Sequence, residues 1–238
     1  MKTNKMLVVS AAWALFALCE GRAEHKLFGY TEPVRSAQAA FAEAGVLDAI
    51  LVKEGDHVRK GDVLAHLDFR GLEHDLNIAK ETKRIQKMRH AQLETLFEKE
   101  SIPAAEVEKS RSDSLIAEER VKRIQTQLDA RKLRAPFDGV IVQIFRERSE
   151  SISAARSEVL KIAQLDVLHV VVHVPLEMAD RFSKGRAIPV KLENTVETEA
   201  EIVFVSPVID AASRTVRIRL QIPNQEGALR AGMLCVLI

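Results

Sequence analysis

The chain has 238 residues, of which 47% are hydrophobic and 29% are charged, and its formal net charge at pH 7 is +1. This composition is typical of a globular protein with one domain or several small ones. The near-zero charge gives no reason to expect a nucleic-acid partner or an anionic membrane surface, and the 5% aromatic content disfavours a large aromatic-lined substrate pocket.

The first residues have the pattern of an export signal. Lys2 and Lys5 precede an apolar run over residues 6–18, which is too short to span a bilayer comfortably. Residues 21–23, Gly-Arg-Ala, then place small side chains at the two positions that a signal peptidase reads. The sequence therefore predicts a signal peptide over residues 1–23 and export of the mature chain.

Cleavage is predicted between Ala23 and Glu24, with a retained anchor as the competing interpretation. Lipidation at Cys19 is a third interpretation, and Leu18 disfavours it because lipoprotein signals carry a small residue there. After cleavage the one remaining cysteine is Cys235, so an internal disulfide is not possible. Its apolar surroundings in the sequence predict a buried small hydrophobe rather than a nucleophile.

Residues 24–40 are predicted as an N-terminal strand segment, and residues 41–68 as short strands. The latter are apolar on both sides of a period-two pattern, which is typical of strands inside a sandwich. The pairs Gly55-Asp56 and Gly61-Asp62 supply the positive φ and the local hydrogen-bond acceptors of tight turns. Two turns are thus predicted to fold three short strands into a compact sheet.

Residues 69–133 are predicted as two helices joined by a short turn. Glycine is absent from residues 72–133, and apolar residues recur at helical spacing. Pro103 is tolerated in a first helical turn and not in an interior, so the second helix is predicted to begin there, capped by Ser101 or Ile102. At about 1.5 Å per residue the antiparallel pair is expected to be roughly 40 Å long.

The two helices are expected to meet along heptad seams. Lys83, Gln86 and His90 interrupt the apolar stripe of the first helix. The rest of that stripe is Leu72, Leu76, Ala79, Leu93 and Phe97. The seam of the second helix is Val107, Ser110, Ser114, Ala117, Val121, Ile124 and Leu128.

Strand patterns return in residues 134–165 and form a weak internal repeat with residues 41–68. Aligning Gly139 with Gly45 matches the apolar positions on both sides. The simplest explanation is one sandwich of two similar halves, with the helical hairpin inserted between them. The matched pairs include Leu47 with Ile141 and Val58 with Ile152.

Residues 166–238 contain apolar segments punctuated by proline and glycine, which predicts a small antiparallel β-barrel with a short helical or turn segment near Leu176. His169 and His173 lie four residues apart and face one side of a strand, but two ligands alone do not make a metal site. We interpret them as ordinary structural histidines and expect no metal.

Four stretches of the sequence now resemble a known family. They are GVLDAILVKEGDHVRKGDVLAHLD (45–68), RAPFDGVI (134–141), VSPVIDAASRTVRIRLQIPN (205–224) and LRAGM (229–233). With the inserted hairpin, in this order, they resemble the periplasmic adaptors, or membrane fusion proteins, of tripartite resistance-nodulation-division efflux pumps. The similarity covers nearly the whole mature chain.

The resemblance implies an elongated, mostly β protein with three modules. Residues 41–68 and 134–165 would form a split lipoyl-like sandwich, 69–133 an antiparallel coiled-coil hairpin, and 166–238 the barrel. It also implies a non-enzymatic subunit without a cofactor, which bridges an inner-membrane transporter to an outer-membrane channel and forms a ring, usually a hexamer. The expected location is the periplasm, with association to the inner membrane through the transporter.

Three groups of site residues follow from the resemblance. The hairpin tip would dock the channel, the lipoyl turns would shape the sandwich, and the barrel motif would support the barrel layer. The tip is Gln92, Leu96, Phe97, Ser101, Ile102 and Pro103; the turns are Gly55, Asp56, Gly61, Asp62 and Gly139; the barrel motif is Asp210, Arg214, Thr215, Asn224 and Gly232. Arg59 and Lys60 are candidates to meet a neighbouring protomer.

The sequence departs from the family pattern in three places. Ser149-Glu150 and Ala155-Arg156 replace the turn glycines of the second lipoyl half, which predicts a longer and more mobile loop. Of the usual tip residues only Leu96 matches, because Gln92 and Pro103 occupy the other two positions. The sequence stops at Ile238, soon after the barrel, so we expect a reduced or different transporter contact.

Two alternative functions remain open from the sequence. One is an adaptor of a type I secretion system or another ATP-binding-cassette exporter. The other is a biotinyl or lipoyl carrier, which needs an exposed lysine on the turn between the sandwich halves. Residues 69–133 replace that turn, so the sequence disfavours the carrier.

Overall fold

The computed structural model describes residues 26–153, 157–193 and 196–238. The predicted signal peptide, its cleavage site and Cys19 lie outside the described residues, as do Ala155 and Arg156. None of the helices in the described part of the chain combines the length and apolar character of a membrane span.

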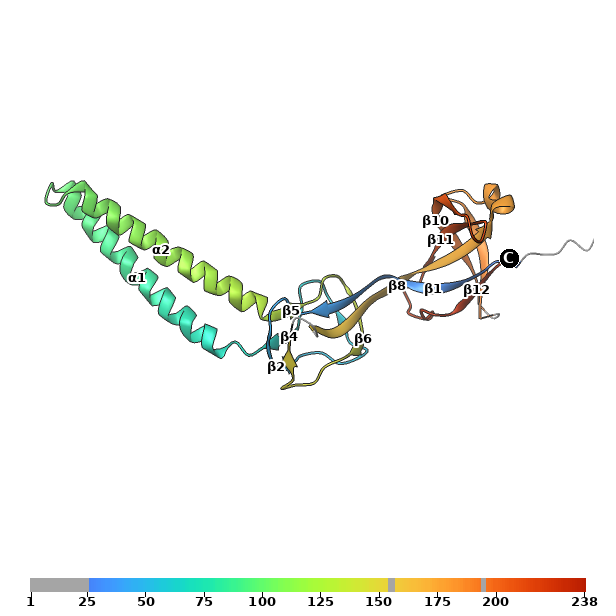
Figure 1. Ribbon diagram of the computed structural model, residues 1–238, viewed down its shortest axis with the longest axis horizontal. Coiled ribbons are helices and arrows are strands. Elements are labelled where there is room, and N and C mark those ends of the chain that lie inside the picture. The colour runs from blue at the N-terminus through green and yellow to red at the C-terminus, as the bar shows by residue number, and fades with distance from the viewer. Residues whose placement is uncertain (1–25, 154–156, 194–195) are drawn as a thin grey trace, which may run out of the picture. The chain divides into compact units, whose positions relative to one another are not determined.

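Strands dominate the fold, with one helical hairpin inserted among them (Figure 1). The chain divides into two compact units. In order, the elements are β1 (Phe28–Ala40), β2 (Gly45–Ile50), β3 (His57–Val58), β4 (Val63–Leu67), α1 (Arg70–Glu98), α2 (Ala104–Ala130), β5 (Lys132–Arg134), β6 (Gly139–Ile144), β7 (Ser151–Ile152), β8 (Glu158–Pro175), η1 (Leu176–Arg181), β9 (Ala187–Leu192), β10 (Val196–Asp210), β11 (Thr215–Pro223) and β12 (Leu234–Leu237).

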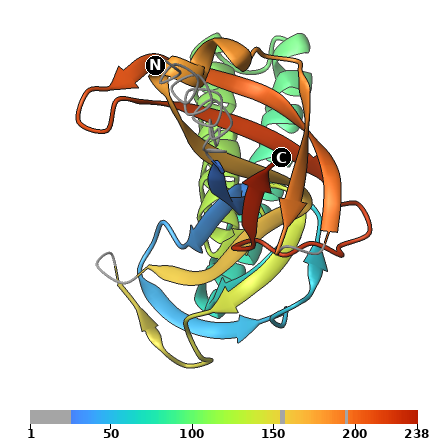
Figure 2. The ribbon, with the colours of Figure 1, turned by 90° about the vertical axis from the view of Figure 1, so that its right-hand side faces the viewer.

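The barrel unit comprises the described residues up to Tyr30, Val170–Leu220 and Met233–Ile238. Its strands follow the order β1-β12-β9-β10-β11-β8, and a further pairing of β1 with β8 closes the ring. In Figure 2, β1 is blue and the other strands of this unit run from orange to red. Alternation along β11 places every second side chain inside, where apolar burial stabilises the barrel. The small β-barrel predicted from the sequence is confirmed.

The hairpin unit comprises Thr31–His169 and Gln221–Gly232. The sequence predicts a barrel over residues 166–238. Of these, residues 166–169 and 221–232 fall in the hairpin unit, although β11 continues in the barrel sheet as far as Pro223. Thr31 links the end of this second segment to β1: its hydroxyl donates to the Arg230 carbonyl over 2.7 Å, and its own carbonyl accepts the Gly232 N–H over 2.6 Å.

The sandwich in this unit consists of a sheet with the order β5-β4-β2-β7 and the strands β8, β6 and β3. Each half exchanges its short strand: β3 pairs with β6 of the second half, and β7 pairs with β2 of the first. The predicted single sheet of β2, β3 and β4 is therefore wrong, because only β2 and β4 pair with each other. The exchange buries Leu47, Val58, Ile141 and Ile152 in one shared core.

The turns between the short strands have the geometry that their residues favour. Gly55 and Gly61 both have a φ of +92°. Asp56 accepts a hydrogen bond from the Lys53 N–H over 2.8 Å, and Asp62 accepts one from Arg59 over 2.8 Å. The carboxylates thus hold the backbone on the entry side of each turn.

Gly139, predicted among the turn residues, begins β6 instead. A Cβ added there would lie 2.6 Å from the carbonyl oxygen of Ala163 on the neighbouring strand β8. Glycine is required because two backbones approach closely, not because the chain turns.

Candidate functional site

The helical hairpin carries most of the candidate site residues, and in Figure 1 its two helices lie side by side. All seven predicted seam positions of α2 are buried or half-buried. Pro103 is itself the residue that precedes α2, with φ −70° and ψ 148°, and no side chain caps the helix. The predicted caps Ser101 and Ile102 therefore do not cap α2, because the proline already supplies the extended conformation that starts it.

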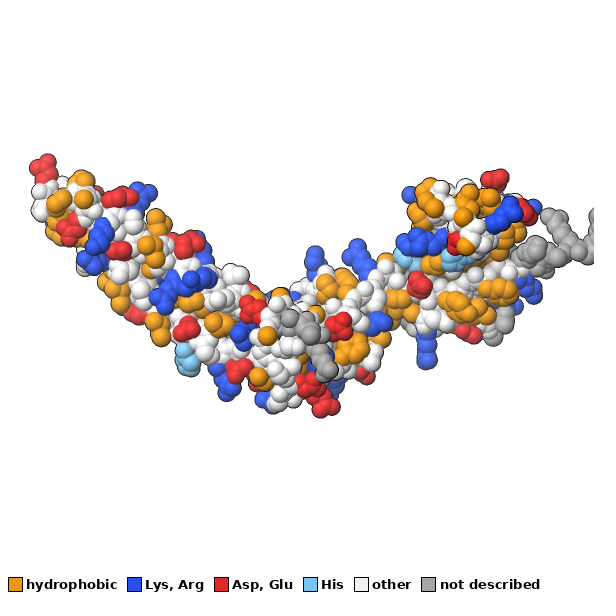
Figure 3. All heavy atoms as spheres, viewed as in Figure 1, with side chains coloured by type: hydrophobic (Ala, Val, Ile, Leu, Met, Phe, Trp, Pro, Cys, Tyr) orange, Lys and Arg blue, Asp and Glu red, His pale blue; other side chains and the backbone are white. Residues whose placement is uncertain are grey.

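The hairpin tip brings most of its predicted residues together. Ser101 donates its N–H to the Leu96 carbonyl over 3.0 Å, and Glu100 adopts a φ of +56° to close the turn. Leu96 and Phe97 remain 41% and 45% exposed, and Ile102 is half-buried beside them in the sequence. Figure 3 shows orange hydrophobic side chains among the charged ones at this end of the hairpin. Gln92 is exposed on α1, one helical turn before Leu96.

The half of the hairpin nearest the sandwich has an apolar core. Ala79 of α1 packs with Val121, Ile124 and Leu128 of α2, and Phe69, Leu72 and Leu76 cover this cluster. Burial of this apolar surface holds the two helices together, since surface ion pairs add little.

The half nearest the tip has a polar seam, which we define as Lys83, Gln86, His90 and Ser110. Lys83 Nζ lies 3.0 Å from Glu118 Oε1, and His90 Nδ1 lies 2.9 Å from Ser110 Oγ. Because the Ser110 hydroxyl donates to the Val107 carbonyl, we assign the hydrogen-bond donor of the His90 pair to Nδ1. Gln86 Oε1 is buried, and no described residue offers it a hydrogen bond.

The first three, Lys83, Gln86 and His90, are the residues that interrupt the apolar stripe of α1 in the sequence. They lie in the seam, so the interrupted register is the real one. Small Ser110 on α2 leaves room for His90 to enter the seam. A polar seam costs stability but helps to fix the register of two helices, since Lys83 and His90 each reach a polar partner on α2. The register in turn decides which residues reach the tip.

The root of the hairpin is fixed by Arg131 and Asp68. Arg131 Nη1 donates to the Asp68 carbonyl over 2.8 Å, and its Nε lies 3.7 Å from a Glu43 carboxylate oxygen. Hydrogen bonds from the Arg70 side chain and backbone hold the pKa of the Asp68 carboxyl at about 2, well below its ordinary 3.8. These contacts tie the first and last residues of the inserted segment to the sandwich.

The barrel motif is divided between two places. Asp210, Arg214 and Thr215 lie together where β10 turns into β11. Asp210 Oδ1 accepts the N–H groups of Ala212 (2.9 Å) and Ser213 (3.4 Å), and these backbone hydrogen bonds lower the pKa of its carboxyl.

Asn224 and Gly232, the other two motif residues, belong to the hairpin unit. The Asn224 amide nitrogen donates to the carbonyls of Leu165 (2.8 Å) and Leu229 (3.0 Å), and its oxygen accepts the Leu229 N–H (2.8 Å). This buried amide joins the loop after β11 to β8 and is fully satisfied, so its role is structural. Nothing in the sequence pattern predicts this division of the motif.

Neither a metal centre nor a reactive thiol is found in the described parts of the chain. No group of three or more His, Cys, Asp and Glu side chains there has the arrangement of a metal site. Cys235 is buried, and desolvation raises the pKa of its thiol to about 11, as expected for a packing residue.

Comparisons with known proteins agree with this architecture. Residues 168–237 match the family model described as CusB-like, beta-barrel domain. The cation efflux system protein CusB of Escherichia coli K12 is 29% identical over 198 residues, which cover 80% of this chain and 45% of that protein. The chain spans about half the length of the curated relatives it matches.

Two solved structures share the fold. A MacA-MexA chimera with the Pseudomonas aeruginosa MexA α-hairpin has a TM-score of 0.78 at 18% identity, covering 89% of this chain and 78% of the chimera. The membrane fusion protein Spr0693 of Streptococcus pneumoniae R6 has a TM-score of 0.73 at 18% identity, covering 90% of this chain and 97% of that one. The resemblance of this chain to the periplasmic adaptor proteins of efflux pumps is thus confirmed.

Proposed function

We propose that this protein is the non-enzymatic periplasmic adaptor of a tripartite efflux pump, bridging an inner-membrane transporter and an outer-membrane channel. Several copies would form the bridge as a ring, which is usually a hexamer in the family that the chain resembles. The observation that carries the proposal is the hairpin tip, where Leu96 and Phe97 are exposed at the end of two paired helices. Solubility alone would favour polar residues there, so exposed apolar groups favour a protein partner.

The tip supports a geometric rather than a chemical role. Its turn is closed by backbone hydrogen bonds to the Leu96 and Phe97 carbonyls, so the apolar side chains are presented without a large ordering cost on binding. Gln92 and Pro103 stand where the family pattern has other tip residues. The contact with the channel is therefore restricted to Leu96, Phe97 and Ile102. We infer a channel whose periplasmic end offers an apolar groove to these three side chains.

The test is Leu96→Asp in a strain that depends on this pump for drug or metal resistance. We expect normal folding and export but lost resistance, because a charge would enter an apolar contact. Thr126→Asp is the matched control, since it adds the same charge at an exposed position of α2 far along the sequence from the tip. Unchanged resistance with Leu96→Asp would contradict docking through the tip.

Crosslinking identifies the partners. A photoreactive residue at position 97 or 102 is expected to capture an outer-membrane channel in cells. Co-purification of a resistance-nodulation-division transporter supports the proposal, and co-purification of an ATP-binding-cassette exporter assigns the adaptor to that class instead.

A further inference from the structure

The barrel unit has a protruding feature that the proposed tip contact does not use. We call residues 207–214, the end of β10 and its connection to β11, the barrel tip. All eight of these residues are exposed, including Val208 at 72% and Ile209 at 47%. Two consecutive large apolar side chains exposed at the end of a strand indicate a contact surface.

The barrel tip is held in shape before any partner binds. Ser206 Oγ donates to the Val208 carbonyl over 2.9 Å and accepts the Val208 N–H over 3.1 Å. On the other side, Asp210 accepts two backbone N–H groups, as described above. Bracing on both sides of Val208 and Ile209 lowers the entropy lost on association.

The strand beside the barrel tip is cationic. Arg217 and Arg219 both place their guanidinium carbons 5.9 Å from the centre of the Phe204 ring, an arrangement that holds the arginine side chains in place. Among the residues described, neither these two arginines nor Arg214 forms an ion pair with a carboxylate. Such preordered and unpaired guanidinium groups suit a carboxylate-bearing partner.

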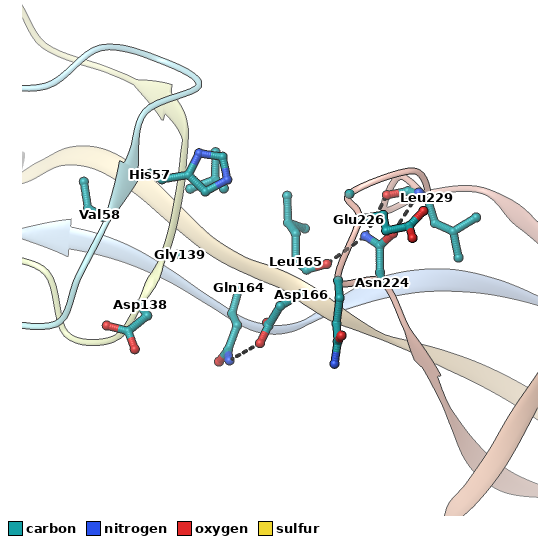
Figure 4. A pocket seen from close by; sticks show the side chains of 13 residues that line it. His57, Val58, Asp138, Gly139, Gln164, Leu165, Asp166, Asn224, Glu226 and Leu229 are labelled. Atoms are coloured by element: carbon teal, nitrogen blue, oxygen red, sulfur yellow. Dashed lines mark hydrogen bonds between the residues drawn. The ribbon is translucent and has the colours of Figure 1, made fainter.

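A groove in the hairpin unit is apolar and carries acidic side chains, in contrast to the arginines beside the barrel tip (Figure 4). Its volume is about 640 Å³, and its apolar lining includes Val58, Leu165 and Leu229. The carboxylates of Asp138, Asp166 and Glu226 lie around it, and no ion pair involving them is found in the described part of the chain. No residue of the barrel tip lines the groove within its own chain.

The groove is also a rigid structure. Asn224 fixes its 224–229 side through three hydrogen bonds to Leu165 and Leu229, and Asp138 accepts the Lys60 N–H over 2.7 Å. An apolar floor with three carboxylates matches an apolar pair flanked by three arginines. Charge complementarity of this kind determines which surfaces associate and in which register.

From this match we infer that the barrel tip of one copy docks into the groove of a second copy, with Val208 and Ile209 on the apolar lining and the arginines near the carboxylates. The two surfaces differ, so the contact is heterologous, and repetition produces a ring when the rotation closes. The inference rests on the proposed function in one respect only, that the adaptor works as a ring. It assigns the self-contact to specific residues.

Mixing two single-cysteine variants of the purified mature chain, both in a Cys235→Ala background, tests the contact directly. Ile209→Cys is expected to crosslink with Gln225→Cys across copies. Ser36→Cys, which replaces a different exposed residue of the hairpin unit, is the matched control and is expected to give no crosslink. Absence of the first crosslink, or equal yields for both, would overturn the inference.

Charge exchange gives a second test by sedimentation velocity. Arg217→Glu and Glu226→Lys are each expected to weaken self-association by about tenfold or more, and their combination to restore it. Lys184→Glu and Glu147→Lys, at exposed positions of the same units, are the controls without effect. Because no channel or transporter is present, failure here would leave the tip-to-channel proposal standing. If Ile209→Cys crosslinks in cells only to the transporter, the barrel tip is a transporter contact and the self-docking inference is wrong.

Discussion

Ser149 donates its backbone N–H to the carbonyl oxygen of Leu47 over 2.7 Å, and the equivalent bond in the other sandwich half runs from Gly55 to Ile141 over 2.8 Å. Ser149 adopts a φ of +71°, close in kind to the +92° of Gly55. The second half therefore retains the turn geometry of the first without its glycine. The longer, mobile loop predicted for this half stays a prediction, because its other replaced pair, Ala155-Arg156, lies outside the described residues.

Ser149→Gly is expected to stabilise the protein. A serine in the left-handed region pays a steric cost that glycine avoids, so we expect a gain of about 0.5–1 kcal/mol in the free energy of unfolding. Urea titration followed by circular dichroism measures it. Gly55→Ser is the reverse substitution at the equivalent turn, and its free energy of unfolding should fall by about 1 kcal/mol. Equal stability of Ser149→Gly and wild type would mean that the Ser149 turn carries no strain.

Gly139→Ala should destabilise the sandwich. The added Cβ would lie 2.6 Å from the Ala163 carbonyl oxygen, so β6 and β8 must separate, at a cost of about 1–3 kcal/mol. Gly71→Ala makes the same chemical change in α1 with no atom within 4 Å, and there we expect a gain of up to about 1 kcal/mol. Thermal unfolding measures both changes in stability. A loss for Gly139→Ala with a gain for Gly71→Ala confirms that a close backbone approach requires Gly139, whereas changes in the same direction contradict it.

Gln86→Leu should stabilise the outer half of the hairpin. It removes a buried, unpaired amide oxygen and adds apolar surface to the seam, so a gain of about 1 kcal/mol is expected. Hydrogen exchange of the amides around Gln86 and Ser110 reports the change locally. Gln92→Leu, at an exposed position of the same helix, should alter protection little. Faster exchange in Gln86→Leu would show that the amide stabilises the seam.

Acid should loosen the hairpin root through Asp68. Its folded pKa of about 2 lies below the ordinary 3.8, so its contribution to stability is complete above about pH 4 and is lost as the pH falls toward 2. The urea concentration at half-unfolding should therefore fall between about pH 4 and pH 2. This fall should be smaller in Asp68→Asn and unchanged in Asp113→Asn. Because Asp68 and Arg70 are exposed, added salt should reduce the difference.

Some of the candidate sites could be predicted from the sequence and others could not. The residues of the hairpin tip and the turn glycines follow from the sequence because each depends on neighbours within a few positions: Pro103 begins a helix, and Gly55 permits a positive φ. The polar seam was visible only as an interruption, since the partner of His90 lies on the other helix. The groove beside Asn224 had no sequence signal, because its walls come from segments far apart in the chain.

The sequence by itself determined the order of strands and helices and the insertion of a hairpin into a repeated sandwich, because periodicity and turn chemistry act over short distances. The tertiary structure alone decided that β3 and β7 exchange between the halves and that Gly139 serves a close backbone approach. The physical reason is that each of these depends on pairing between backbone groups distant in sequence, and one chain's residue pattern is compatible with several such pairings.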